Sequence, residues 1–152
     1  MTGIDTRLRS LLAELHAHLR EELDGVLPTA CDPDAGIWAR WAAVKVFEDE
    51  LRPGLQAERE LVDAVGSRLS RAQAEHLWVT GELLAALELR LGELGRMPRT
   101  CPEFISSAAG YRRAFDYWCR DVEAFVGPLP TAAVPAELLA RLELLEEARV
   151  TA

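Results

Sequence analysis

The amino-acid sequence predicts an all-α protein built as an antiparallel up-down-up-down four-helix bundle with an additional short C-terminal helix. Three observations predict this fold. The composition is rich in the helix formers Ala, Leu, Glu and Arg. Apolar residues recur at helical spacing, without the period-2 runs that are typical of strands. Gly and Pro divide the chain into long amphipathic segments joined by short loops.

The length of the chain suits a single core. It has 152 residues, of which 49% are hydrophobic, and single cores typically serve about 100–200 residues. We expect the four-helix bundle over residues 1–130. Residues 131–152 are expected to form a linker and an amphipathic helix that packs on the bundle or on a partner subunit.

The first two helices have recognisable ends. Asp5 is a candidate cap for a helix from Thr6 to Leu27, which Pro28 is expected to stop. The second helix is expected from Ile37 to Val65 and should be interrupted at Pro53-Gly54, because proline cannot donate a hydrogen bond to the preceding turn. Its apolar stripe contains Phe47, Leu51, Leu55, Leu61, Val62 and Val65.

The next two helices are bounded by capping residues. Ser67 or Ser70 can open a helix that ends near Leu94, and Thr100-Cys101-Pro102-Glu103 is a capping box that opens the fourth helix. The expected stripe of the third helix contains Leu69, Ala72, His76, Val79, Leu83, Leu87 and Leu94. That of the fourth contains Phe104, Ala108, Tyr111, Phe115, Trp118, Val122 and Val126. The C-terminal helix is expected from Ala136 to Arg149.

Charge and hydropathy exclude several function classes. The 25 acidic residues outnumber the 17 Lys and Arg residues, and the sequence has no basic patch, so we expect no binding to nucleic acid or to anionic membranes. There is no secretory h-region and no apolar stretch long enough to span a bilayer. We therefore expect a cytoplasmic protein, in which Cys31, Cys101 and Cys119 are reduced thiols without an assigned role.

Polar residues on the apolar stripes are the candidate functional residues, because a bundle core is otherwise aliphatic. At roughly 100° per residue, Glu58 falls near the centre of the second helix's stripe and His76 near the centre of the third helix's stripe. His16 lies at the edge of the first helix's stripe, and Glu123 lies at the edge of the fourth.

Each helix carries a short pattern that is similar to one in hemerythrin-like domains. The family has a His in the first helix, F-x-x-x-L-x-x-H-x-x-x-E in the second, an E-H pair in the third and H-x-x-x-x-D/E before a proline in the fourth. The matching segments are His16-Ala-His-Leu19-Arg-Glu-Glu-Leu23, Phe47-Glu-Asp-Glu-Leu51-Arg-Pro-Gly54-Leu-Gln-Ala-Glu58, Glu75-His76 and Trp118-Cys-Arg-Asp-Val-Glu123. Over roughly residues 8 to 129, the chain resembles the hemerythrin-like (HHE cation-binding) family.

The resemblance implies a metal centre in the bundle core. In the family, several histidines and two carboxylates hold a pair of irons that bind oxygen. Residue-by-residue transfer leaves His16, Glu58, His76 and Glu123 as metal ligands. Gly54 and Trp118 stand where the family has histidines. The resemblance thus implies a binding protein with a reduced or lost iron or zinc centre, open to oxygen, nitric oxide or a small ligand.

Two alternatives remain open, and with them whether the protein is an enzyme. In the first, Gly54 and Trp118 bound a small-molecule pocket in which Glu58 acts as a general base with a pKa raised by burial. In the second, the chain is a non-catalytic interaction module whose C-terminal helix can form a homodimer.

Overall fold

The fold was obtained as a computed structural model, which describes residues 5–32, 34, 36–94 and 102–150. Over these residues the chain is helical and contains no strand. The long helices are α1 (Arg7–Ala30), α2 (Ile37–Val46), α3 (Arg52–Val65), α4 (Arg71–Leu94), α5 (Pro102–Phe125) and α6 (Ala136–Val150). A π-helical turn, η1 (Phe47–Leu51), joins α2 to α3, and short 3₁₀ turns, η2 (Gly66–Arg68) and η3 (Thr131–Ala133), precede α4 and α6.

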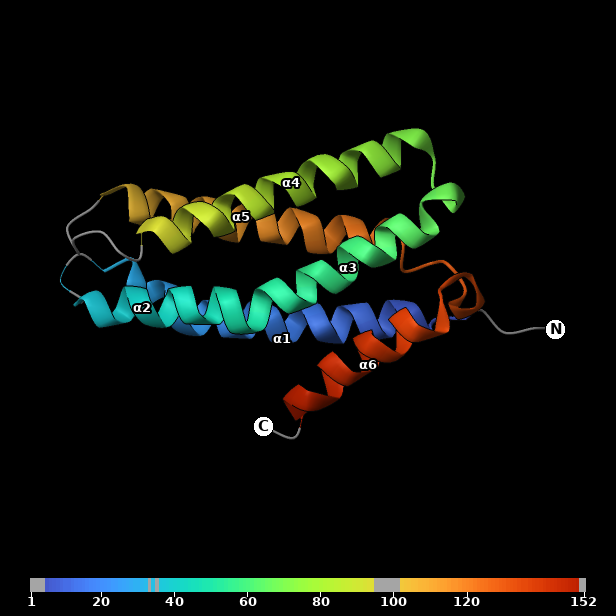
Figure 1. The fold of residues 1–152 in the computed structure, drawn as a ribbon, viewed down its shortest axis with the longest axis horizontal. Helices are drawn as coiled ribbons and strands as arrows, with labels where there is room; N and C mark the ends of the chain where they lie inside the picture. The colour runs from blue at the N-terminus through green and yellow to red at the C-terminus, as the bar shows by residue number, and fades with distance from the viewer. Residues whose placement is uncertain (1–4, 33, 35, 95–101, 151–152) are drawn as a thin grey trace.

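Helices α1, α2, α4 and α5 run along a common long axis, and α6 crosses it obliquely (Figure 1). Helix α2 packs along α1, whereas α3 turns away from α1, and α4 and α5 pair with each other over their length. Contacts between α1 and α5 join the two pairs, whereas α3 and α4 touch over a short stretch only. Because α4 is held mainly by α5, it leaves space beside α3.

Most predicted boundaries are confirmed. The second helical segment begins at Ile37 and ends at Val65. The interruption expected at Pro53 takes the form of the π-helical turn η1 directly before it, which places Pro53 in the first turn of α3, where its missing N–H costs no helical hydrogen bond. Ser70 caps α4 through its hydroxyl, which accepts from the Gln73 N–H at 3.2 Å. The capping residues Thr100 and Cys101 lie outside the described residues.

The prediction that Pro28 ends the first helix is wrong, because α1 continues to Ala30. Pro28 lies in the last turn of α1, where it removes one backbone hydrogen bond, the one to the carbonyl of Asp24. The helix tolerates this loss because it ends two residues later. Cys31 then closes the helix by donating its N–H to the carbonyl of Leu27 at 2.8 Å.

The expected stripes on α1, α3 and α5 do form the core. On α1 the buried leucines are Leu8, Leu11, Leu12, Leu15, Leu19, Leu23 and Leu27. On η1 and α3 the expected apolar residues from Phe47 to Val65 are all buried. On α5 the buried members are Ala108, Tyr111, Phe115, Trp118 and Val122, with Val126 just beyond it, whereas the side chain of Phe104 lies outside the described residues.

The expected stripe on α4 is wrong. Val79 is 59% exposed and Leu83 is 50% exposed, whereas the neighbouring Leu84 is 2% exposed. The buried apolar residues of α4 are Leu77, Leu84 and Leu91. The row with Val79 and Leu83 and the row with Leu77, Leu84 and Leu91 are both apolar at helical spacing, so periodicity alone does not show which is buried. Packing against α5 buries the second row.

The C-terminal helix packs on its own chain. Helix α6 contacts α3 and α1 (Figure 1) and buries Leu138 and Leu142. The linker is tied to the start of α1, because the Asp5 carboxylate accepts hydrogen bonds from the N–H and the hydroxyl of Thr131, both at 2.8 Å. No helix within the described residues is long and apolar enough to cross a membrane.

Candidate functional site

Three of the four predicted metal ligands meet in the core. His16 comes from α1, Glu58 from α3 and Glu123 from α5, and Trp118 from α5 joins them. His16 and Glu58 are fully buried and Trp118 is 1% exposed. The side chain of Glu123 is 31% exposed, in agreement with its predicted place at a stripe edge. We call these four side chains the core cluster.

The core cluster is a chain of hydrogen bonds with the imidazole in the middle. The indole Nε1–H of Trp118 donates to Glu58 Oε2 at 3.2 Å. The other oxygen of Glu58 pairs with Nε2 of His16. On the far side of the ring, Nδ1 of His16 lies 3.1 Å from Oε2 of Glu123. Both ring nitrogens therefore face carboxylates, which suits an imidazolium that donates from each.

The electrostatics support a charged His16. Burial by itself would lower the pKa of His16, but the charge of Glu58 and hydrogen bonds with Cys119, Glu123 and Glu58 raise it from 6.5 to about 12. The hydrogen bond from His16 in turn lowers the pKa of Glu123, against the opposing effect of its partial burial. Burial raises the pKa of the neighbouring Cys119 thiol, which stays protonated.

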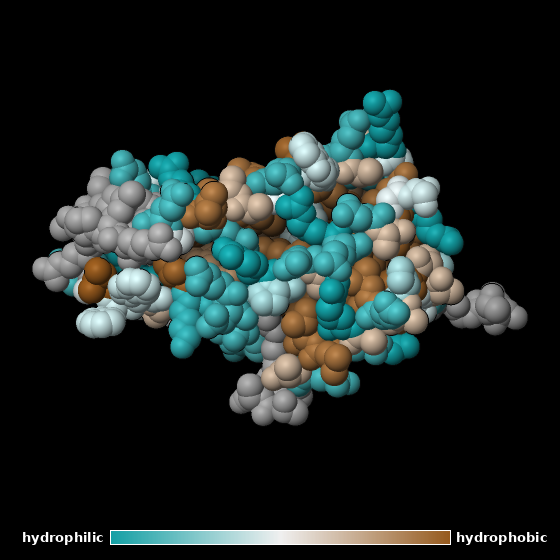
Figure 2. Space-filling model, viewed as in Figure 1, coloured by the Kyte–Doolittle hydropathy of each residue, from teal (hydrophilic) through white to brown (hydrophobic). Residues whose placement is uncertain are grey.

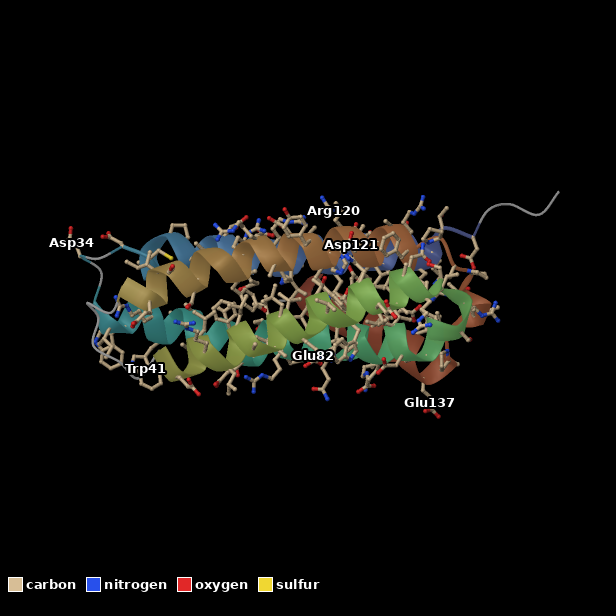
Figure 3. The ribbon with its side chains drawn as sticks, turned by 90° about the horizontal axis from the view of Figure 1, so that it is seen from above. Asp34, Trp41, Glu82, Arg120, Asp121 and Glu137 are labelled. Carbon is tan, nitrogen blue, oxygen red and sulfur yellow. The ribbon has the colours of Figure 1, made fainter. Side chains whose placement is uncertain are left out.

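His76, the fourth predicted ligand, lies apart from the core cluster. Its side chain is 57% exposed, and its Nε2 lies 2.6 Å from Oδ2 of Asp121 on α5. Figure 3 labels Asp121 beside Arg120, whose Nε is 3.7 Å from the same carboxylate. The prediction that His76 points into the core is wrong for the same reason as the α4 stripe: the helix is rotated so that Leu77 is buried instead.

Gly54 and Trp118 do not enclose the pocket that the sequence suggested. A Cβ at Gly54 would lie 3.2 Å from a methyl group of Leu19, so the volume left by the absent side chain is already occupied. Trp118 fills the core on the other side of Glu58. With both carboxylate oxygens of Glu58 engaged, this arrangement removes the basis for Glu58 acting as a general base on a bound substrate.

The donors as arranged do not fit a metal ion. A ligating histidine needs one nitrogen free for the metal, whereas both nitrogens of His16 are held by carboxylates on opposite sides of the ring. No group of three or more His, Cys, Asp or Glu side chains in the described parts of the chain is arranged to hold a metal. The core cluster is instead a buried ion pair between His16 and Glu58, whose polar atoms form hydrogen bonds within the cluster.

A groove between α3 and α4 was not predicted from the sequence. It consists of two cavities, of about 200 Å³ and about 230 Å³, which share Arg59 and Trp118 as lining residues. Figure 2 shows apolar atoms between hydrophilic ones over these two helices. Sequence reasoning missed this α3–α4 groove because it depends on how little α3 and α4 touch and on the rotation of α4.

The polar side chains of the first cavity are Arg52, Gln56, Arg59 and Glu88, and its apolar walls include Leu55, Leu84 and Trp118. Trp118 thus connects the two sites, since its indole N–H binds Glu58 in the core cluster and its ring lines the groove. The one available signal in the sequence was Glu88 itself, an acidic residue on the row that contains Leu77, Leu84 and Leu91.

Comparison of the chain with models of protein families, with curated protein sequences and with solved structures gave no match.

Proposed function

We propose that the chain is a hemerythrin-like binding protein that has lost its metal centre, with a buried ion-paired cluster in the centre's place. The observation that carries the proposal is that both nitrogens of His16 are engaged, by Glu58 and by Glu123. Ligand binding then belongs to the α3–α4 groove rather than to the middle of the core.

The order and placement of the helices support the family assignment within this proposal. The sequential pairing of α1 with α2, and of α4 with α5, agrees with an antiparallel up-down-up-down four-helix bundle. His16, Glu58 and Glu123 come from three different helices at the positions that the resemblance gives to metal ligands, and they do converge.

The two other readings have less support. An enzyme with Glu58 as its base would need a substrate within reach of that carboxylate, and its oxygens bind His16 and Trp118 instead. An interaction module that acts through the C-terminal helix would need apolar residues on the free face of α6. Leu144, which is 63% exposed, is the large hydrophobic residue that α6 exposes over its described side chains.

A single substitution, Glu58→Gln, tests the proposal. Gln keeps the shape and can still accept from Trp118, but the imidazolium of His16 loses a buried counter-ion, so we expect the free energy of unfolding to fall by about 3 kcal/mol. Urea titration at neutral pH measures this loss. Elemental analysis of protein expressed with ample iron and zinc and purified without chelator should give well below one metal per chain, for wild type and variant alike.

The matched control is Glu14→Gln, which removes one carboxylate from the exposed face of α1 and should leave stability unchanged. One iron or zinc per wild-type chain that is lost in Glu58→Gln would overturn the proposal in favour of a working metal centre. Unchanged stability in Glu58→Gln would mean that the core cluster is not ion-paired.

A further inference from the structure

Glu88 is a partly buried carboxylate in the wall of the α3–α4 groove, and only part of its hydrogen-bonding capacity is used. Its side chain is 10% exposed. Oε1 accepts a hydrogen bond from the hydroxyl of Tyr111 at 3.2 Å. Oε2 lies 3.9 Å from Nε of Arg52, which is within ion-pair range but too long for a hydrogen bond. Within the described residues, Oε2 is therefore left open to a donor in the cavity.

The partner of Glu88 is rigidly held. Tyr111 is fully buried, and its ring packs edge-on against Phe47, with the centroids 4.4 Å apart. A fixed tyrosine orients the carboxylate to which it donates. The carboxylate thus has a defined position in the groove wall.

Two guanidinium groups line the same cavity from α3. Arg52 follows η1 directly, and π-helical turns are often found at functional sites. Arg59, about two turns further on, pairs with Glu82 of α4, whose side chain is 49% exposed. Glu82 lies on the edge of α4 away from α5 (Figure 3). Exposed pairs of this kind contribute little stability, so Arg59 can exchange Glu82 for another carboxylate at small cost.

We propose that the first cavity of the α3–α4 groove binds a small zwitterion, an apolar α-amino acid, with its ammonium group on Glu88 and its carboxylate on Arg52 and Arg59. A cationic ligand without a carboxylate would take Glu88 from Arg52 and give Arg52 no carboxylate in return, and an anionic ligand without an ammonium group would face Glu88. Only a ligand with both charges satisfies both sides of the cavity.

The size and the walls of the cavity define the rest of the ligand. A volume of about 200 Å³ is below the usual range of about 300–1,000 Å³ for sites that bind drug-sized ligands. Leu55, Leu84 and the ring of Trp118 offer an apolar surface to a side chain. This inference rests on the proposed binding function and specifies its ligand, but it involves no residue of the core cluster other than Trp118.

The experiment uses L-leucine and two analogues that each lack one charge, 4-methylpentanoate without the ammonium group and isopentylamine without the carboxylate. Isothermal titration calorimetry with the full chain should show saturable binding of leucine and at least about tenfold weaker binding of each analogue, since each loses a charged hydrogen bond. In ¹⁵N-labelled protein, leucine should shift the indole N–H resonance of Trp118.

Two variants locate the site. Glu88→Gln retains an acceptor for Tyr111 but loses the charge, so leucine should bind about tenfold more weakly and lose its advantage over 4-methylpentanoate. Glu82→Gln is the matched control, because it removes a carboxylate from the same helix outside the cavity and frees Arg59. Leucine should bind to it at least as tightly as to the wild type.

Three results would overturn this inference. They are the absence of saturable leucine binding up to about 10 mM, equal binding of leucine and both analogues, or equal weakening by Glu88→Gln and Glu82→Gln. None of these results depends on metal content, so a failure of the amino-acid site would not contradict the proposal that the metal centre has been lost. Conversely, a full complement of metal in the core would contradict that proposal without contradicting the amino-acid site.

Discussion

His16 shows how one residue's surroundings decide its chemistry. A lone histidine between leucines is compatible with a metal ligand, a neutral core residue or a buried cation. The positions of Glu58 and Glu123 on both sides of its ring select the cation, because each nitrogen has an acceptor within reach. The same two carboxylates that resemble metal ligands therefore compete with a metal for the histidine.

The charge on His16 predicts a specific pH dependence of stability. Its pKa is about 12 in the folded protein, against an ordinary value of 6.5. Its stabilising contribution is complete below pH 6.5 and is lost as pH rises toward 12, at about 1.4 kcal/mol per pH unit for one proton. Glu123 acts in the opposite direction, since its lowered pKa gives a contribution that is lost on acidification.

The double variant His16→Leu/Glu58→Gln is the reference for this effect. It removes the buried ion pair but keeps an acceptor for Trp118. We expect the wild type's free energy of unfolding, relative to that of the double variant, to decrease between about pH 7 and about pH 10. Urea titrations across this range measure it. Parallel pH curves for the two proteins would contradict a buried imidazolium.

For individual residues, the sequence predicted only part of the candidate site. The placement of Glu58 on the core stripe was predictable because the second helix is strongly amphipathic, and the structure buries Glu58 completely. The partners of Glu58 were not predictable, since they depend on the rotation of α1 and α5 toward α3. Glu88 was missed for a related reason, because it was placed outside the core stripe assumed for its helix.

Among the helices, α4 shows where periodicity stops being informative. It has two apolar rows about 100° apart around the helix, one with Val79 and Leu83 and the other with Leu77, Leu84 and Leu91. Helices α1, α3 and α5 have one main apolar row each, and there the expected stripe and the buried residues agree. A helix that is apolar on most sides needs knowledge of its neighbours before its buried face can be assigned.

A pair of adjacent substitutions tests the rotation of α4. Leu84→Ala should lower the free energy of unfolding by about 2–5 kcal/mol, because it removes a side chain that is 2% exposed and leaves a cavity. Leu83→Ala, at a position that is 50% exposed, should change it by about 0.5 kcal/mol or less. Thermal and urea unfolding compare the two variants. The reverse order of stability would restore the stripe that the sequence suggested and would close the α3–α4 groove.

The sequence predicted where the second helix is interrupted, but not that the interruption is the π-helical turn η1. Proline at position 53 made an interruption necessary, and the turn that precedes it accommodates the missing N–H by shifting the hydrogen bonds of one turn. The shift sets the direction of two side chains at its ends. Phe47 packs on Tyr111, and Arg52 lines the groove.

The contacts between helices are distributed unevenly over the whole molecule. Helices α4 and α5 form one closely packed pair and α1 and α2 form another, while α3 contacts α4 over a short stretch only. The groove exists because of this difference. The C-terminal helix reinforces the opposite side, where α6 covers α1 and α3 and forms ion pairs from Arg141 to Glu60 and from Glu143 to Arg7.

Removal of α6 tests whether it belongs to this chain's own core or to an interface between copies. Leu142 is fully buried and Leu138 is 8% exposed against α1 and α3. A chain that ends at Val134 should therefore unfold at a lower temperature, yet show the same number of subunits in light scattering after size exclusion. Leu142→Ala should lower stability by about 2–5 kcal/mol, whereas Leu144→Ala, at an exposed position, should change it little. A change in subunit number, either on truncation or in Leu144→Ala, would show instead that α6 joins two copies, because a helix docked only on its own chain affects unfolding without affecting association.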